Sequence, residues 1–553
     1  MKNSKFLLAV VLVILSFFPA CQKEAPINSN RAVIAISSDI NSYNPLYAVN
    51  FNEGMVMQLL YPSLLRYKWN SKTGELDAYP MLAKKWEWNR DSTSITFYLQ
   101  DNAKWTDGES VTAEDIVFSF DVYSDPKVES RYYGSFKTLP VDSTQHIILT
   151  KTFKIENPHE VTIYFKKDAI PSLSEINLPI LPKHVYKGID RKDFITAEKT
   201  LKPVSDGPFY LDKWEKNQAI FLKANTNFIF YNKENLGEII FKIIPDYNSS
   251  ITQLKNGEVD FVQDVKADDI PVIKKNNNLI IDPIKGRDYD YIGWNNIDPQ
   301  VYEKTKKIVP NKLFGNPLVR EALTYALNRK EVVDQFLDNY GQPAVSPIAP
   351  IFKNALDTTL HPFPFDPQKA KELLTRAGWQ DVNNEGILSK GGQKFSFTLY
   401  IPSGNPRREF AAALFKNNLR AIGIDMKVEA LEPGVFFPKM YKKEFDAWIA
   451  GWTVAIPILL KPLWYSTLPD GAYNVVTYQN RQVDEVIDNI IKSRSAGEKN
   501  FLYKEFQQII YKDQPTTFLY WIDNIVVYNK RLQNVKISPL GPIDNCWEWR
   551  VNK

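Results

Sequence analysis

The sequence predicts an α/β protein with an additional strand-rich region between about residues 70 and 205. Apolar runs that alternate with period two, as in half-buried strands, recur along the chain. After residue 205 they are separated by segments with apolar residues three and four positions apart, as in amphipathic helices. The length of 553 residues also exceeds the ~250–300 residues that one hydrophobic core organises, so we expect two or three domains.

The N-terminus has the pattern of a secretory signal, which we assign to residues 1–20. Two lysines precede a charge-free apolar run, Phe6 to Phe18, that is shorter than the ~20 residues of a membrane-spanning helix. Cys21 follows a small residue, as in bacterial lipoproteins, so we expect lipidation there and a tether over residues 21–30. Because Phe18-Pro19 is atypical for such a signal, cleavage without lipidation stays open. The predicted location is the cell envelope, lipid-anchored and facing the periplasm or the exterior.

Short strands dominate the expected structure of the first half of the chain. Asp107-Gly108 indicates a hairpin turn, and Thr112 with Asp115 three residues later forms a capping box that begins a helix. Gly257 is expected to end a helix. The other expected elements are strands at 31–36, 95–99, 159–167, 208–214, 219–225 and 239–246, and helices within 52–65 and from 251.

The second half alternates helices and strands. Pro317 begins a helix whose apolar residues repeat with helical spacing, and Arg320 is expected to make ion pairs on its surface. Asp366 as N-cap, Pro367 at the first helical position and Gly378 after the end delimit another helix. The other expected elements are strands at 395–401, 424–431, 445–452, 516–522 and 525–529, and helices at 410–422 and 500–513.

Charge and motifs exclude several functions. The net charge is only +4, from 68 Lys and Arg against 64 Asp and Glu with mixed signs, so no nucleic-acid partner is expected. The chain has no GxSxG, HExxH, GxxxxGK[ST] or CxxC motif, and we therefore expect no enzyme and no cofactor. The four histidines are far apart and predict no metal site: His146, His159, His184 and His361. Cys546, between aromatic residues, is expected to be a buried, inert thiol.

Six ordered stretches carry a family resemblance: PMLAKKWEWNRDSTSITFYLQDNAKWTDGESVTAEDIVFSF, DGPFYLDKW, QLKNGEVD, NPLVREALTYALNRKEVV, FDPQKAKELLTRAGW and FDAWIAGW. They resemble motifs of the bacterial extracellular solute-binding proteins of the peptide/nickel type, which include oligopeptide- and dipeptide-binding proteins that serve ABC importers. The likeness spans roughly residues 31 to 545. Turns, caps and helix faces explain most of these motifs without a ligand.

The resemblance implies a periplasmic-binding-protein-like fold with two main lobes, a hinge and an insert domain. Domain I would combine residues 31–68, 205–285 and 516–553. Domain II, the strand-rich insert, would be residues 69–204, and domain III residues 286–515. Two connecting strands would act as the hinge, and the ligand would be enclosed as the lobes close.

The implied function is that of a membrane-anchored, monomeric receptor that hands a peptide or related solute to an ABC permease and its ATPase subunits. Three alternatives stay open: a sensing or interaction lipoprotein that does not transport, a binder of oligosaccharide rather than peptide, and an unrecognised hydrolase. The nickel-binding branch is disfavoured, because no histidine follows His361.

The segment after the Gly451-Trp452 pair is expected to line the cleft with Trp452, Thr453, Val454 and Ala455. Alternation places Trp448, Ala450 and Trp452 on one face of a strand and Ala447, Ile449 and Gly451 on the other, with Trp448 in the core. Trp452, at the carboxyl end, is expected to face the ligand, although a core position for both tryptophans stays open.

Other ligand contacts are expected from the resemblance: Asn50, Phe51, Tyr473, Asn474 and Arg407. For Arg407 and its neighbour Arg408, a solvated helix start is the alternative. In the peptide-binding relatives an aspartate in the segment after Gly-Trp pairs with the α-ammonium of the peptide, whereas residues 453–457 contain no acid. Since a buried ammonium without a counter-charge costs several kcal/mol, we expect the cleft to reject a free peptide N-terminus bound in the usual way.

Overall fold

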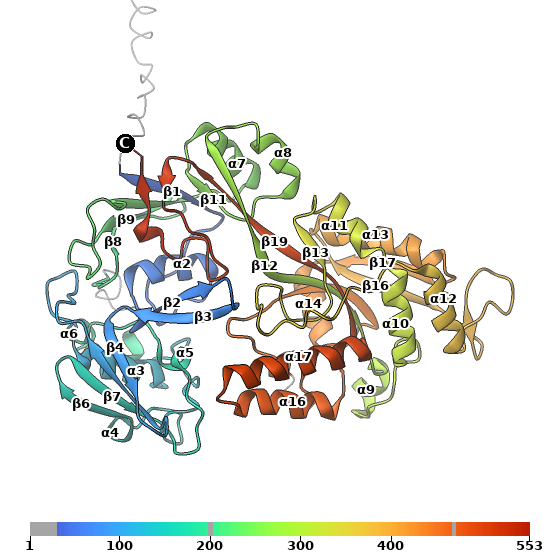
Figure 1. Cartoon of the computed structure of the whole chain (residues 1–553), viewed down its shortest axis with the longest axis horizontal. Helices are drawn as coiled ribbons and strands as arrows, with labels where there is room; N and C mark the ends of the chain where they lie inside the picture. Colours follow the sequence, from blue (N-terminus) through green and yellow to red (C-terminus); the bar gives the residue numbers. More distant parts are fainter. Residues whose placement is uncertain (1–29, 197–202, 467–471, 553) are drawn as a thin grey trace, which may run out of the picture.

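The computed structural model describes residues 30–196, 203–466 and 472–552, and it forms two lobes that lie side by side (Figure 1). The predicted signal segment, Cys21 and most of the predicted tether lie outside the described residues. None of the described helices is long and apolar enough to cross a membrane.

One mixed sheet passes through both lobes, and eleven strands belong to it. Ten of them follow the order β17-β16-β18-β12-β19-β11-β1-β10-β9-β8, and β13 adds to β19. Their bounds are β1 Arg31–Ile36, β8 Phe209–Glu215, β9 Ala219–Ala224, β10 Glu238–Ile243, β11 Phe261–Val262, β12 Leu279–Trp294, β13 Gly341–Pro343, β16 Ser396–Pro402, β17 Asp425–Leu431, β18 Ala447–Thr453 and β19 Thr516–Asn529.

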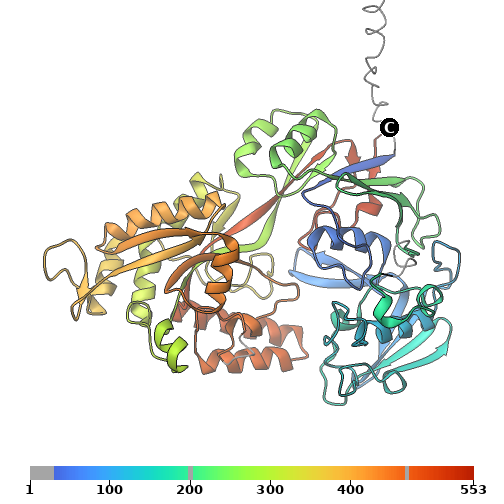
Figure 2. The ribbon, with the colours of Figure 1, turned by 180° about the vertical axis from the view of Figure 1, so that it is seen from behind.

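The long strands β12 and β19 connect the lobes. They pair antiparallel from Leu279 opposite Asn529 to Gly293 opposite Thr516, and they cross the middle of the molecule in both views (Figures 1 and 2). The register shifts between Ile284 and Asp288, where the carbonyl oxygen of Ile522 leaves no room for a side chain on Gly286: a Cβ there would lie 1.8 Å from it. A bulge at this point of two shared strands is a suitable place for a hinge.

The first lobe contains the β1 end of the large sheet and a separate strand-rich unit. That unit is an antiparallel sheet in the order β4-β5-β7-β6 with α3 packed on it. Its elements are β4 Ala83–Trp88, β5 Ser94–Leu99, α3 Ala113–Ser124, α4 Leu149–Thr152, β6 Phe153–Asn157, β7 Glu160–Tyr164, α5 Leu173–Ile176 and α6 Lys183–Tyr186. The hairpin β2 (Leu65–Asn70) and β3 (Glu75–Pro80), and helices α2 (Phe51–Leu60), α7 (Tyr247–Asn256) and α8 (Ile270–Ile273), complete the lobe.

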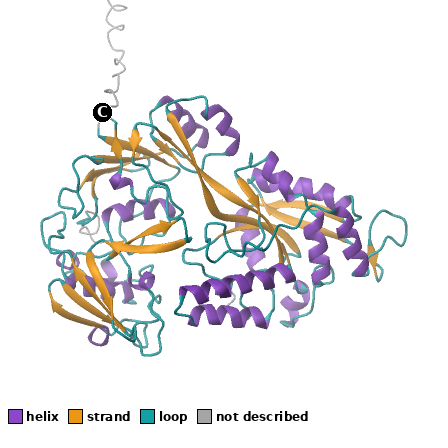
Figure 3. Cartoon of the chain, in the orientation of Figure 1, coloured by secondary structure: helices purple, strands orange, loops and turns teal. Residues whose placement is uncertain are grey.

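Helices cover both faces of the sheet in the second lobe (Figure 3). Ala447 and Ile449 of β18 belong to the core on one face, whereas Trp448 and Ala450 belong to the core on the other, as the alternation predicts. The helices are α9 Pro299–Thr305, α10 Pro317–Ala326, α11 Arg329–Gln335, α12 Pro367–Arg376, α13 Pro406–Arg420, α14 Pro433–Tyr441, α15 Lys461–Trp464, α16 Arg481–Lys492 and α17 Ala496–Asp513.

Local sequence signals predict many of these elements correctly. Strand β1 has the predicted bounds, Thr112 and Asp115 form the predicted capping box, and Gly257 ends α7 with φ 77°. Asp366 caps α12 as predicted. Cys546 is buried, as predicted, and burial raises the pKa of its thiol.

Two predictions about the large sheet and the second lobe are wrong. The segments 516–522 and 525–529 form one strand, β19, and the other hinge strand, β12, was not predicted. Arg320 does not lie on the surface: it is 3% exposed and donates hydrogen bonds to the carbonyl oxygens of Phe314, Asp513 and Gln514. Burial lowers its pKa to about 10. The domain boundaries inferred from the resemblance stay predictions.

Candidate functional site: an interlobe cleft

Five adjoining cavities lie in and beside the gap between the lobes. We name them the hinge chamber (about 260 Å³), the lysine chamber (about 450 Å³), the central chamber (about 420 Å³), the tryptophan pocket (about 200 Å³) and the insert chamber (about 620 Å³). Neighbouring cavities share lining residues: Ile284 and Lys285 join hinge and lysine chambers, Thr453 joins hinge chamber and tryptophan pocket, and Ile456 joins central and insert chambers. The cavities therefore form one branched cleft.

The hinge chamber contains two carboxylates. Asp288 of β12 lies opposite Thr453 of β18, and the Thr453 hydroxyl donates a hydrogen bond to it. Asp264 lies in the loop after β11 with φ 56°, a left-handed conformation that costs a non-glycine residue free energy. The surrounding protein partly desolvates Asp264 and raises its pKa, and the charge of Asp288 raises it further. Arg287 donates to the carbonyl oxygen of Val454, 2.5 Å away.

The premise of the expected rejection of a free N-terminus, that the cleft offers no counter-charge, is therefore wrong. Residues 453–457 contain no acid, but Asp288 supplies a carboxylate from the neighbouring strand at the level of Thr453. The prediction considered one segment only, and strand β12 was not predicted, so its pairing with β18 could not be used. The period-two alternation of Asp288 and Asp290 with buried tyrosines in RDYDYIGW was the available signal.

The tryptophan pocket brings together five of the residues expected to bind ligand: Trp452, Thr453, Val454, Ala455 and Tyr473. The rings of Trp452 and Tyr473 meet edge to face with 5.9 Å between centroids. Tyr473 is 48% exposed, whereas Trp448 is completely buried in the core, as predicted. The pair forms an aromatic wall that is accessible from the cleft.

Of the other residues expected to contact ligand, Phe51 lines a cavity and the two asparagines do not. Phe51 lines the hinge chamber and is 58% exposed. Asn50 caps α2 by accepting a hydrogen bond from the amide of Glu53. Asn474 is buried and bonds to the backbone of Tyr465 and Tyr478. Neither asparagine is among the residues that line the five cavities.

Arg407 and Arg408 form a largely buried ion cluster with Asp290. Nε of Arg407 lies 2.8 Å from one carboxylate oxygen, and Nη2 of Arg408 lies 2.9 Å from the other. The Asp290 side chain is 1% exposed, so the expected solvated helix start is wrong. Burial alone would raise the pKa of Asp290, but the two guanidinium charges hold it below its ordinary value. Arg407 is thus engaged within the protein and does not line the five cavities.

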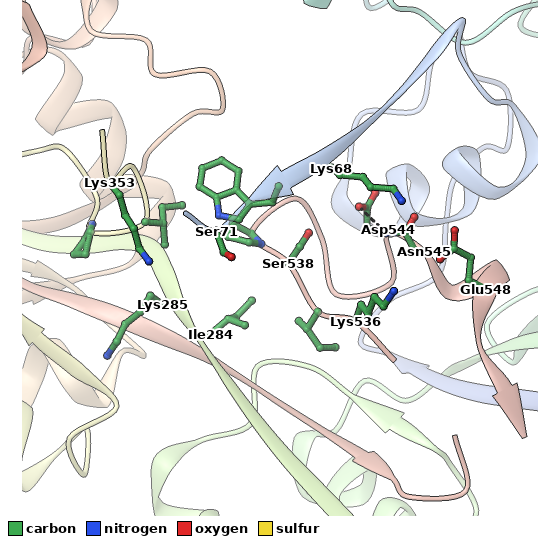
Figure 4. A pocket seen from close by; sticks show the side chains of 15 residues that line it. Lys68, Ser71, Ile284, Lys285, Lys353, Lys536, Ser538, Asp544, Asn545 and Glu548 are labelled. Carbon is green, nitrogen blue, oxygen red and sulfur yellow. Dashed lines mark hydrogen bonds between the residues drawn. The ribbon is translucent and has the colours of Figure 1, made fainter. Parts of the chain in front are cut away.

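More lysines than carboxylates line the lysine chamber (Figure 4). Figure 4 shows Lys285 and Lys353 on one side, and Lys68 and Lys536 on the side of Asp544 and Glu548. Glu548 pairs with Arg66 at 3.0 Å. Burial raises the pKa of Asp544 to about 6, but four lysines still outnumber the two carboxylates that line the chamber. The chamber is therefore a mainly positive part of the cleft.

The β2–β3 hairpin crosses from the first lobe to the second. Its Thr73 carbonyl oxygen accepts a hydrogen bond from the amide of Asn354 at 2.8 Å, and Glu75 accepts bonds from the side chains of Asn354 and Asn500. Trp69 packs edge to face on Phe352, with 5.6 Å between centroids. The hairpin separates the lysine chamber from the insert chamber, since Trp69 lines both.

Replacing Gly74 by alanine is expected to detach this hairpin from the second lobe. Gly74 has φ 72°, and a Cβ would lie 2.2 Å from the carbonyl oxygen of Ile351. Hydrogen exchange of the Asn354 amide should become at least about tenfold faster, because its partner is on the hairpin. Gly108→Ala is the control: it adds the same left-handed strain of ~1–2 kcal/mol but meets no atom within 4 Å. Unchanged protection of Asn354 would contradict the expectation.

The described residues contain no group of three or more His, Cys, Asp or Glu side chains placed to hold a metal ion. His146 bonds to Asp121 and His184 to Asp107, both outside the cleft. None of the described residues that line the five cavities is a histidine.

Two α/β lobes, two shared hinge strands and a cleft lined from both sides are the architecture of the periplasmic-binding-protein-like class of solute-binding proteins. The family described as bacterial extracellular solute-binding proteins, family 5, matches this chain over residues 77–474. The chain belongs to this family of transport proteins and is not an enzyme.

Related sequences align with this chain over nearly its whole length. The oligopeptide-binding protein AppA of Bacillus subtilis (strain 168) is 30% identical over 100% of this chain and 99% of its own, and the glutathione-binding protein GsiB of Shigella flexneri serotype 5b (strain 8401) is 25% identical over 96% of each. The solved structure of Bacillus subtilis AppA with a nonapeptide has a TM-score of 0.70 at 29% identity, covering 95% of this chain and 99% of that one. NikZ of Campylobacter jejuni with Ni(L-His) has a TM-score of 0.71 at 25% identity, covering 95% and 100%.

Proposed function

We propose that this protein captures a peptide with a free N-terminus in the interlobe cleft and delivers it to an ABC permease. The observation that carries the proposal is the cleft itself, because both lobes line it and its walls combine aromatic rings with charged groups of both signs. An extended peptide presents an ammonium, a carboxylate and side chains of varied polarity. The cleft offers carboxylates for the first, lysines for the second and aromatic rings for apolar side chains. The oligopeptide-binding relative supports the same ligand class.

The α-ammonium of the peptide binds in the hinge chamber. Asp288 and Asp264 supply the counter-charge there, and the side chain of Phe51 lies exposed at the same cavity. Two cations line this cavity as well, but Lys285 pairs with Asp523 and Arg287 donates to the carbonyl oxygen of Val454, so both are engaged within the protein. A nickel complex such as the one named for NikZ fits less well, because none of the described residues lining the five cavities is a histidine.

Capture works by a shift between open and closed arrangements of the lobes. The peptide contacts both lobes at once only in the closed arrangement, so it binds that arrangement more tightly and increases its population. Strands β12 and β19 absorb the movement at the bulge around Gly286. No bond of the peptide is formed or broken. The closed receptor docks on the permease as a monomer, held to the membrane by a lipid on Cys21.

Native mass spectrometry of the protein purified from its own host tests the proposal. We expect mass additions that fragment into peptides with unblocked N-termini. A protein that carries only sugars, or that retains no member of a randomised pool of eight-residue peptides with free termini, would contradict it.

Replacing Trp452 by alanine is expected to weaken retention of that eight-residue pool by about ten- to a hundredfold, on the ~1–3 kcal/mol scale of an aromatic hot spot. The melting temperature should change little, because Trp452 lies at the end of β18 and is only partly buried. Trp448→Ala is the matched control on the same face of the strand: complete burial predicts a loss of about 3–5 kcal/mol of stability. If Trp452→Ala melts as low as Trp448→Ala, Trp452 is a core residue and not a ligand contact.

A further inference from the structure

We propose that the insert chamber is the distal part of the peptide-binding track, and that it holds an apolar or aromatic side chain of peptides longer than about five residues. The inference rests on the proposed function and specifies its ligand. It also assigns a role in binding to the strand-rich insert, which supplies Trp88 and Leu173 to this chamber.

One segment of the second lobe connects the two ends of the track. Trp452 to Ala455 line the tryptophan pocket, and Thr453 also lines the hinge chamber. Ile456 and Pro457 line both the central and the insert chamber, and Ile458 lines the insert chamber. A peptide that follows this segment away from Asp288 therefore reaches the insert chamber without leaving the cleft.

The length of the segment sets the length of the ligand. Six residues from Thr453 to Ile458 span at most about 20 Å, at ~3.3–3.6 Å per extended residue. A peptide whose ammonium is bound at Asp288 needs about six residues to cover that distance. Shorter peptides end in the hinge chamber, the tryptophan pocket or the central chamber.

The walls of the insert chamber favour apolar and aromatic groups. Tyr67, Trp69, Trp88 and Tyr503 line it, and Trp88 stacks on Phe165 with 5.6 Å between ring centroids. Both tyrosines are uncharged at neutral pH, and burial raises the pKa of Tyr67 and of Tyr503 further, to about 12. Offset and edge contacts with such rings stabilise an inserted aromatic or aliphatic side chain.

The charged side chains that line the insert chamber, which form its rim, are suited to the negatively charged carboxyl end of a peptide. The carboxylate of Glu75 already accepts hydrogen bonds from Asn354 and Asn500, so it is engaged with the protein. Arg494 and Lys499 leave the rim with positive charge. The hydroxyl of Tyr503 donates a hydrogen bond to the carbonyl oxygen of Ile458 at 3.3 Å, which fixes the end of the connecting segment against the chamber.

The test compares randomised pools of four-residue and eight-residue peptides with free termini, retained by the full-length protein and quantified by mass spectrometry. For Trp88→Ala we expect about tenfold lower retention of the eight-residue pool and no change for the four-residue pool. Tyr164→Ala is the control, since this exposed aromatic residue lies on β7 of the same insert sheet and does not line the five cavities.

A second variant separates loss of the chamber from damage to the insert. Ala496→Trp adds a large side chain at an exposed residue of α17 in the second lobe that lines this chamber and none of the other four cavities, and it should reduce retention of the eight-residue pool as Trp88→Ala does. Equal losses for both pools, or no loss in either variant, would overturn the distal site while peptide capture stands. If the unmodified protein retains neither pool, the proposed function itself fails, and the distal site fails with it.

Discussion

Replacing Asp290 by asparagine is expected to lower the free energy of unfolding by about 3–5 kcal/mol, because removing one partner of a buried ion pair leaves uncompensated charge. The Asp290 side chain is 1% exposed, and those of Arg407 and Arg408 are 21% and 13% exposed. Both guanidinium groups would lose their carboxylate. Urea unfolding at pH 7, followed by tryptophan fluorescence, measures the change.

The pH dependence of this variant provides an independent check. The pKa of Asp290 lies below its ordinary value, so its stabilisation is present above ~4 and is lost as the pH falls through the lowered pKa. The difference between the variant and the unmodified protein should therefore shrink below about pH 4. Glu429→Gln removes an exposed carboxylate from β17, the edge strand of the same sheet, and is the control. A loss below about 1 kcal/mol for Asp290→Asn would contradict the expectation.

Replacing Asp288 by asparagine is expected to weaken binding of peptides with a free N-terminus by about ten- to a hundredfold. The reason is the loss of a charge-assisted hydrogen bond, worth about 1.5–3 kcal/mol. Peptides of the same pool with acetylated N-termini carry no ammonium and should bind the variant and the unmodified protein alike. Retention of the two eight-residue pools, quantified by mass spectrometry, measures the difference.

Asp282→Asn is the matched control for this experiment. Asp282 lies on the same strand, β12, but does not line the five cavities. It should leave retention of both pools unchanged. Equal losses of free and acetylated peptides on Asp288→Asn would show that Asp288 shapes the cleft and does not bind the ammonium.

Local patterns predicted much of the secondary structure of this protein. The caps at Thr112 and Asp366 and the left-handed glycine at the end of α7 depend on atoms within four residues of each other, so the sequence displays them directly. Strand β12 was missed because its middle section, PIKGRD, is polar and partly exposed where it crosses between the lobes. That section gives no period-two signal, and the alternation in RDYDYIGW that follows it was not used.

The candidate site was predicted only in part. The aromatic wall of Trp452 and Tyr473 was expected from the family motif and the alternation of β18, and the structure brings both residues to one pocket. The carboxylates of the hinge chamber were missed, and Arg407 was expected to contact ligand or solvent although it binds Asp290.

The sequence by itself determined the family, the caps and the two faces of β18, because each depends on residue types at fixed short spacing. Only the tertiary structure decided which charges meet. Asp288 bonds to Thr453 across 165 positions, and Asp290 bonds to Arg407 across 117. Local periodicity does not predict such pairings, because they form only when strands that are distant in the chain become neighbours in one sheet.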